Sequence, residues 1–191
     1  RDLHSFPTRR SSDLHSLRFQ NKEHIQMSLR KFLPIMSISI ALSLILSYIE
    51  FLLPSIGVPG VKLGLANLII LMLLIKYPLK VPAAVNMLRI LLAGFMFTGP
   101  IAMMFSLAGG LSSMLIMKLA IKLKVFSNIG VSVAGSCIHN FAQLIVAIVI
   151  LDTFNIIYYM PALIVSGIIS GVAIGILTTI ALPRIEAAAN R

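Results

Sequence analysis

Long apolar runs, separated by short polar or Pro/Gly-rich segments, fill the chain between residues 33 and 182. A helix that crosses a membrane needs about 20 largely apolar residues. Six segments approach or meet that length, and we interpret them as the helices of one bundle. They are residues 33–53, 63–75, 81–97, 101–119, 129–151 and 156–182. The pattern predicts an all-α integral membrane protein with about six transmembrane helices in a single domain, 33–182.

The second segment, 63–75, is the shortest, and it follows a Pro/Gly-rich loop at 54–60. It either spans the membrane or enters and leaves on one side. The last segment ends at Pro183 and Arg184, because proline interrupts a helix. Residues 15–32 then form a basic leader and 183–191 a tail.

The composition fits this interpretation: 58% of the residues are hydrophobic, only 12% are charged, and the mean hydropathy is +0.98. A soluble domain is closer to half apolar and a quarter charged. The 16 Lys and Arg residues lie mostly between the apolar runs. That placement is not typical of a nucleic-acid binder, whose cations gather on a polar face. The single cysteine, Cys137, excludes an internal disulfide and a cysteine-based zinc cluster.

The cations also predict the orientation. If six helices alternate in direction, one side of the membrane receives Arg30, Lys31, Lys76, Lys80, Lys118, Lys122, Lys124, Arg184 and Arg191. The other side receives Lys62, Glu50 and Asp152. Cytoplasmic loops are enriched in Lys and Arg. We therefore expect a multi-pass protein of the cell membrane with both termini in the cytoplasm.

Residues 1–14 read RDLHSFPTRRSSDL and resemble the translation of a sequencing adapter. We expect this stretch to be foreign to the natural protein and leave it out of the fold. Met27 is a plausible natural start.

Polar side chains inside the apolar runs are the candidates for function, because ionisable groups are costly at membrane depth. Arg89 lies at mid-segment with Asn86 three residues earlier on the same helical face. A polar stripe at helical spacing follows the fifth segment, made of Ser132, Ser136, His139, Asn140 and Gln143. The predicted substrate-binding residues are Lys62, Asn67, Asn86, Arg89, His139, Asn140 and Gln143. Their excess of positive charge suits an anionic ligand.

Structural roles compete with each assignment. In the alternative to ligand binding, Arg89 pairs with Glu50 or with backbone carbonyls. The polar stripe of the fifth segment would then join helices by hydrogen bonds. Lys62 would extend to the membrane surface without touching a ligand. Glu50, close to the end of its segment, is either a partner of these cations or simply solvated. Gly167, Gly171 and Gly175 form a small-residue ridge for packing. Serines 39, 43 and 47 form a similar ridge, which either packs within the bundle or presents a surface to a partner helix.

Enzyme signatures are sparse. A prenyl synthase needs clustered aspartates to hold magnesium and diphosphate. No two of the six acidic residues are adjacent, and the sequence has no P-loop. His139 has no second ligand at metal-binding spacing. We expect no catalysis by this chain alone, no metal and no cofactor.

Several segments together resemble the family called heptaprenyl diphosphate synthase component I, or Gx transporter proteins. They are PGVKLGLAN at 59–67, LRILL at 88–92, SLAGG at 106–110, GVSVAGS at 130–136, His139-Asn140 and Gln143. The resemblance covers residues 33–182. It implies kinship with the substrate-binding S components of energy-coupling-factor transporters, which bind a small molecule beneath the loop after the first helix.

The resemblance implies two alternative functions. In the first, the chain binds a small, anionic molecule for uptake and works with a coupling protein and ATPases. In the second, which follows the family's enzyme name, it is a noncatalytic membrane subunit of a heptaprenyl diphosphate synthase in quinone side-chain synthesis. Membrane lipids surround the protein in both cases, and nucleic acid is a partner in neither.

Overall fold

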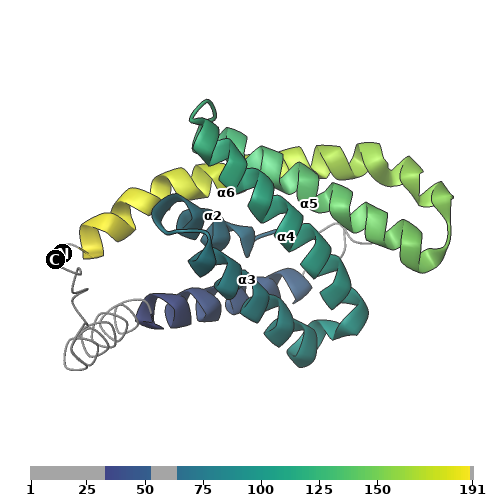
Figure 1. Cartoon of the computed structure of the whole chain (residues 1–191), viewed down its shortest axis with the longest axis horizontal. Coiled ribbons are helices and arrows are strands. Elements are labelled where there is room, and N and C mark those ends of the chain that lie inside the picture. The colour runs from purple at the N-terminus through teal and green to yellow at the C-terminus, as the bar shows by residue number, and fades with distance from the viewer. Residues whose placement is uncertain (1–32, 53–63, 190–191) are drawn as a thin grey trace, which may run out of the picture. The chain divides into compact units, whose positions relative to one another are not determined.

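The computed structural model describes residues 33–52 and 64–189, and all of their regular structure is helical (Figure 1). The first helix is Leu33–Leu52. Its residues up to Ile38 belong to an N-terminal unit, and those from Ser39 onward belong to the unit Ser39–Arg191. The helices and contacts described below are those of the second unit. The predicted all-α fold class is confirmed.

Helix α2 (Asn67–Lys76) is an interior helix. It is apolar on all sides, and Ile70, Leu71 and Leu74 are at most 1% exposed. It packs against α3, α4 and α6. Ten residues extend about 15 Å, which is roughly half of the hydrocarbon thickness of a bilayer. This helix is too short to cross by itself, so the number of six crossings stays a prediction.

Helix α3 (Lys80–Ala93), the π-helical turn η1 (Gly94–Thr98) and helix α4 (Gly99–Leu123) form an apolar stretch of 44 residues. The chain reverses at Gly99, whose φ of 83° is readily adopted only by glycine. Pro100 follows in the first turn of α4, where its missing N–H costs nothing. The reversal divides the stretch into two arms.

The two arms run antiparallel and in contact. A Cβ atom on Gly110 would lie 3.0 Å from the Asn86 amide, and one on Gly94 would lie 2.7 Å from the sulfur of Met103. A straight helix of this length would extend about 66 Å, more than twice the hydrocarbon thickness. Each arm is close to the length of one membrane crossing.

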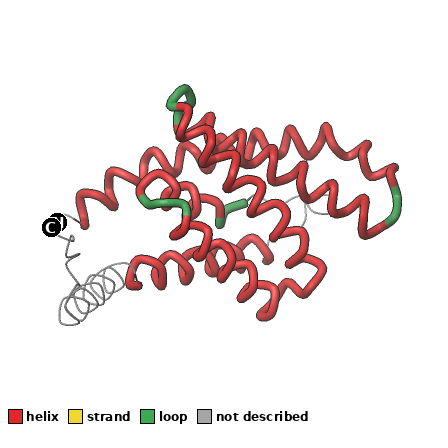
Figure 2. Tube along the Cα trace, in the orientation of Figure 1, coloured by secondary structure: helices red, strands yellow, loops and turns green. Residues whose placement is uncertain are grey.

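Helix α5 (Asn128–Leu151), the 3-10 helix η2 (Phe154–Tyr159) and helix α6 (Met160–Ala189) form a second hairpin. Ser127 caps α5 by accepting the N–H of Gly130. Short loops join the helices, as Figure 2 shows. The left-handed backbone of Asp152 ends α5 at the polar break that the sequence predicts. Helix α6, however, continues through Pro183 to Ala189, so the predicted end at Pro183 is wrong.

Two glycines bring α6 into backbone contact with α5. A Cβ atom on Gly171 would lie 2.5 Å from the Cα of Val133, and one on Gly175 would lie 2.5 Å from the Cα of Ile129. A side chain larger than hydrogen therefore does not fit without separating the helices. The glycine ridge predicted from the sequence is confirmed as a packing surface.

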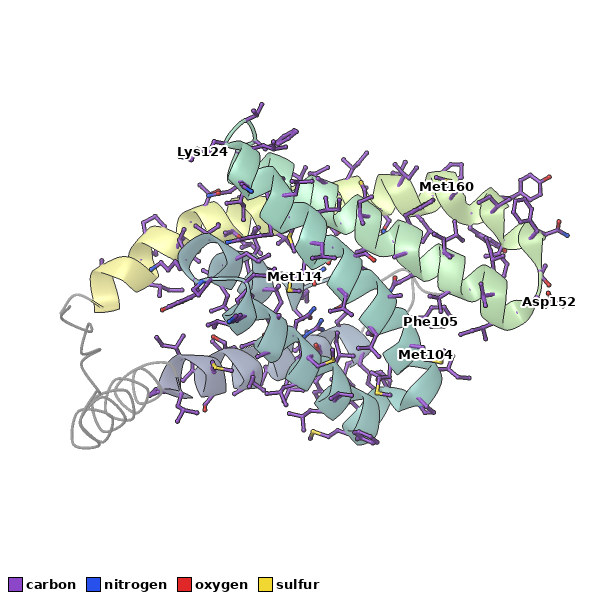
Figure 3. All side chains as sticks on the ribbon, viewed as in Figure 1. Met104, Phe105, Met114, Lys124, Asp152 and Met160 are labelled. Atoms are coloured by element: carbon purple, nitrogen blue, oxygen red, sulfur yellow. The ribbon has the colours of Figure 1, made fainter. Side chains whose placement is uncertain are left out.

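Four stretches are long and apolar enough to cross a membrane: Leu33–Leu52, Lys80–Leu123, Asn128–Leu151 and Phe154–Ile185. Large apolar side chains remain exposed along them, as a lipid-facing surface requires (Figure 3). Lys124 and Asp152 lie at opposite ends of α5 (Figure 3). The cytoplasmic position of the termini stays a prediction.

Candidate functional site

A small polar pocket lies inside the apolar helices. It is lined by Ser47, Glu50, Gly64, Ala66, Asn67, Arg89, Ile90, Ala93, Thr98, Ser106 and His139. These residues come from the first helix, the start of α2, the arms α3 and α4, and α5. The pocket is partly open, and its volume of about 30 Å³ has room for roughly two water molecules.

Among the described residues that line this pocket, Arg89 carries a permanent positive charge, although it is only 7% exposed. Its Nη1 donates to Ser47 Oγ at 3.2 Å, and its Nη2 donates to Asn86 Oδ1 at 2.7 Å. A guanidinium has five N–H donors. The Nε is buried and has no acceptor among the described residues. Arg89 therefore has N–H donors that the described residues do not use.

Local sequence explains why Asn86 supports Arg89. Residues three apart lie on the same face of a helix. Gly110 on α4 leaves the space that the Asn86 side chain occupies, because a Cβ there would be 3.0 Å from its Nδ2. Asn86 is fully buried outside the pocket lining, and its Oδ1 orients the guanidinium by accepting the hydrogen bond from Nη2.

Glu50 supplies the negative charge on the wall of the same pocket. Its Oε1 accepts the backbone N–H of Gly64, just before α2 begins. The amino end of a helix stabilises an anion. Glu50 also attracts the Arg89 guanidinium electrostatically.

The structure brings three of the predicted residues, Asn67, Arg89 and His139, to the pocket wall. Asn86 lies behind the wall as a partner of Arg89. The whole polar stripe of α5 is buried, as its helical spacing predicts. Part of the predicted group of substrate-binding residues therefore lies at or directly behind the wall of this pocket.

Besides Asn86, two predicted residues among those described do not line the pocket. The Asn140 amide donates to the backbone oxygen of Leu163 at 2.8 Å and so joins α5 to α6. Gln143 is buried, and its Oε1 has no hydrogen-bond donor among the described residues. Lys62 lies outside the described residues.

Sequence reasoning left Ser47, Ser106 and Thr98 out of the predicted site, and it left the role of Glu50 open. Ser47 and Glu50 are three residues apart, on one face of the first helix, and this spacing was a usable signal. This spacing did not identify a binding site, because Ser47 also belongs to the serine ridge, which suits helix packing. No three His, Cys, Asp or Glu side chains within the described residues form a metal-binding group.

Apolar helices of crossing length around an internal polar pocket define an all-helical membrane protein. The chain belongs to the family described as heptaprenyl diphosphate synthase component I, which matches residues 39–181. This match includes every residue that lines the pocket. No curated protein and no solved structure shows a significant similarity to the chain.

Proposed function

We propose that this membrane protein is a substrate-binding subunit, similar in role to the S components of energy-coupling-factor transporters, for uptake of a small molecule with an anionic group. The observation that carries the proposal is Arg89. A buried cation is costly unless an anion compensates it. Arg89 lines a pocket, and each of its two Nη groups donates one hydrogen bond to a described residue, although each carries two N–H bonds. An anionic solute in the pocket would accept hydrogen bonds from the remaining Nη–H groups.

The lining of the pocket supports a polar solute. Asn67 and His139 supply hydrogen-bonding groups to the wall of the same pocket, and Ile90 and Ala93 supply apolar surface. A few convergent polar groups in an otherwise apolar site are typical of small-molecule recognition. In this proposal Lys62 adds a second cation, and Asn140 and Gln143 support the site from α5.

The partners follow from what the chain lacks. The sequence has no P-loop, so ATP hydrolysis would come from separate ATPases through a membrane-embedded coupling protein. With both termini cytoplasmic, the pocket would receive its solute from outside the cell. These partners and this direction are parts of the proposal.

The family's description favours a second candidate: a noncatalytic membrane subunit of a polyprenyl diphosphate synthase in quinone side-chain synthesis. A catalytic role of this chain in that reaction is less well supported. Magnesium diphosphate sites use several carboxylates. The pocket has Glu50 as its acidic residue, next to a cation, and the chain's other acids are dispersed along the sequence.

The deciding experiment is native mass spectrometry of the protein isolated in mild detergent from cells that contain its natural partners. The transport proposal expects a bound small molecule and co-purified ATPases. Arg89→Lys should lose most of the small molecule, because lysine keeps the charge but not the fork of donors. Arg184→Lys, an exposed position on α6, is the matched control and should retain it. A co-purified prenyl synthase without any bound solute would instead favour the second candidate.

A further inference from the structure

We infer that an aromatic belt at one end of the helices binds the headgroup boundary of the lipid bilayer. The belt consists of exposed aromatic side chains in two connections, η1 and η2, and on the first helix beside η1. Its members are Tyr48, Phe51, Phe95, Phe154, Tyr158 and Tyr159. The inference does not depend on the solute, because it concerns the surface that faces the lipid.

The helix contacts place η1 and η2 at the same level. A Cβ atom on Gly109 of α4 would meet His139 of α5. Further along α4, Met117 lies against Gly135, which comes earlier in α5. The two helices are therefore antiparallel, and the start of α4 is level with the end of α5. Because η1 directly precedes α4 and η2 follows α5, both connections lie at this end.

Tyr48 and Phe51 extend the belt to the first helix. The Tyr48 ring lies 5.4 Å from the ring of Phe97 in η1, edge to face, and the Phe51 ring lies 5.5 Å from it. Tyr48 and Phe51 nevertheless stay half-exposed. The cluster therefore joins the first helix to η1 and leaves part of each of these two rings open to the surroundings.

The exposure and chemistry of the belt fit the lipid boundary. Phe95 and Tyr158 are each 82% exposed, and η2 has no buried residue. A tyrosine suits this boundary because its ring is apolar and its hydroxyl forms hydrogen bonds. The chain has four tyrosines, and all but Tyr77 belong to the belt.

The length of α5 places the belt at the edge of the hydrocarbon. Its 24 residues extend about 36 Å, and the hydrocarbon is about 30 Å thick. Asp152, where α5 ends, lies at the tip of the α5–α6 hairpin (Figure 3), and the exposed polar residues Thr153 and Asn155 follow it. Among the described residues, the other exposed aromatic side chains are Phe126, before the opposite end of α5, and Phe141, in its middle.

The test uses tryptophan as a depth probe, because the sequence contains none. Tyr158→Trp and Tyr48→Trp place the probe in the belt, and Phe141→Trp, in the middle of α5, is the matched control. Each purified full-length variant is reconstituted in phosphatidylcholine vesicles that contain lipids brominated near the glycerol end or near the methyl end of the acyl chain. Bromine near the glycerol end should quench both belt probes more strongly, by a factor of about two. Phe141→Trp should show the reverse order.

Three outcomes would overturn the inference. Stronger quenching of the belt probes by bromine near the methyl end would place the rings inside the hydrocarbon. Quenching by aqueous acrylamide alone would place them in water. Protection from acrylamide and from both lipids would mean that a second copy of the chain covers the belt. Circular dichroism checks that each variant folds, and Tyr159→Trp replaces Tyr158→Trp if that variant does not.

Discussion

The imidazole of His139 on α5 lies directly against the backbone of Gly109 on α4. A Cβ atom on Gly109 would be 2.8 to 2.9 Å from three atoms of the ring. Because these distances are nearly equal, the face of the ring covers the glycine. Gly109 and its neighbour Gly110 thus admit two polar side chains from two different helices, His139 and Asn86. This glycine pair leaves room for a residue of the pocket wall, His139, and for the hydrogen-bond partner of Arg89, Asn86.

Gly109→Ala should move the His139 ring and lower the free energy of unfolding. Overpacking of a filled interior typically costs about 1 to 3 kcal/mol. The backbone of α4 cannot retreat easily, because α4 packs against α5 along its length. Thermal unfolding in detergent, followed by circular dichroism, measures the change.

A double substitution identifies the cause. If the clash with the ring is responsible, Gly109→Ala should be much less harmful in a His139→Ala background, with a coupling energy of about 0.5 to 3 kcal/mol. If the two substitutions lower the free energy of unfolding additively, the contact between the new Cβ atom and the His139 ring is not the cause of the loss.

Asn86→Ala should destabilise the protein because it removes the acceptor of the 2.7 Å bond from Arg89. A hydrogen bond to a charged group contributes about 1.5 to 3 kcal/mol. The same variant should weaken solute binding, since the guanidinium loses its orientation. Urea unfolding and calorimetric titration measure the two effects. Asn155→Ala, on the exposed helix η2, is the matched control and should change neither.

The helices were predictable to the extent that their ends carry local signals. Helix α5 begins after its Ser127 cap and ends at Asp152, close to the predicted 129–151. Helix α2 begins at Asn67 rather than at residue 63, because the preceding turn contains Gly64 with a φ of 70°. Apolar composition continues through that turn and cannot reveal it.

The site was predictable where the cost of burial alone identifies a residue. Arg89 stands out because a cation in the middle of an apolar run requires a reason. Glu50 could not be assigned in the same way. Its contact with Gly64 depends on how two segments approach each other in three dimensions, and no spacing in the sequence encodes that approach.

Gly171→Ala should destabilise the α5–α6 hairpin more than Gly167→Ala. The new Cβ would meet the Val133 Cα at 2.5 Å in the first case, but its nearest neighbours at 3.2 Å in the second. We expect a loss of about 1 to 3 kcal/mol for Gly171→Ala and a smaller one for Gly167→Ala. Thermal unfolding in one detergent compares the two. Equal effects would contradict backbone contact as the basis of the ridge.

Lys118→Met should loosen the carboxyl end of α2. The Lys118 Nζ donates to the backbone oxygen of Leu74 at 3.1 Å, and a cation near the last carbonyls of a helix stabilises it. Methionine keeps the length of the side chain without the charge. We expect a loss of about 1 kcal/mol and faster amide exchange in α2, measured by hydrogen–deuterium exchange. Lys122→Met, at an exposed position of α4, should leave α2 unchanged.

The orientation is testable by cysteine labelling in a Cys137→Ser background. Because the chain reverses at Gly99, Lys80 and Lys124 lie at the same end of the α3–α4 hairpin. Helix α5 begins shortly after Lys124, and Thr153 follows the opposite end of α5. If the cationic ends face the cytoplasm, a membrane-impermeant maleimide added outside intact cells should modify Thr153→Cys only. Lys80→Cys and Lys124→Cys should react only after the membrane is opened. Modification of Lys124→Cys and Thr153→Cys from the same side would show that α5 does not cross, and would overturn the predicted topology.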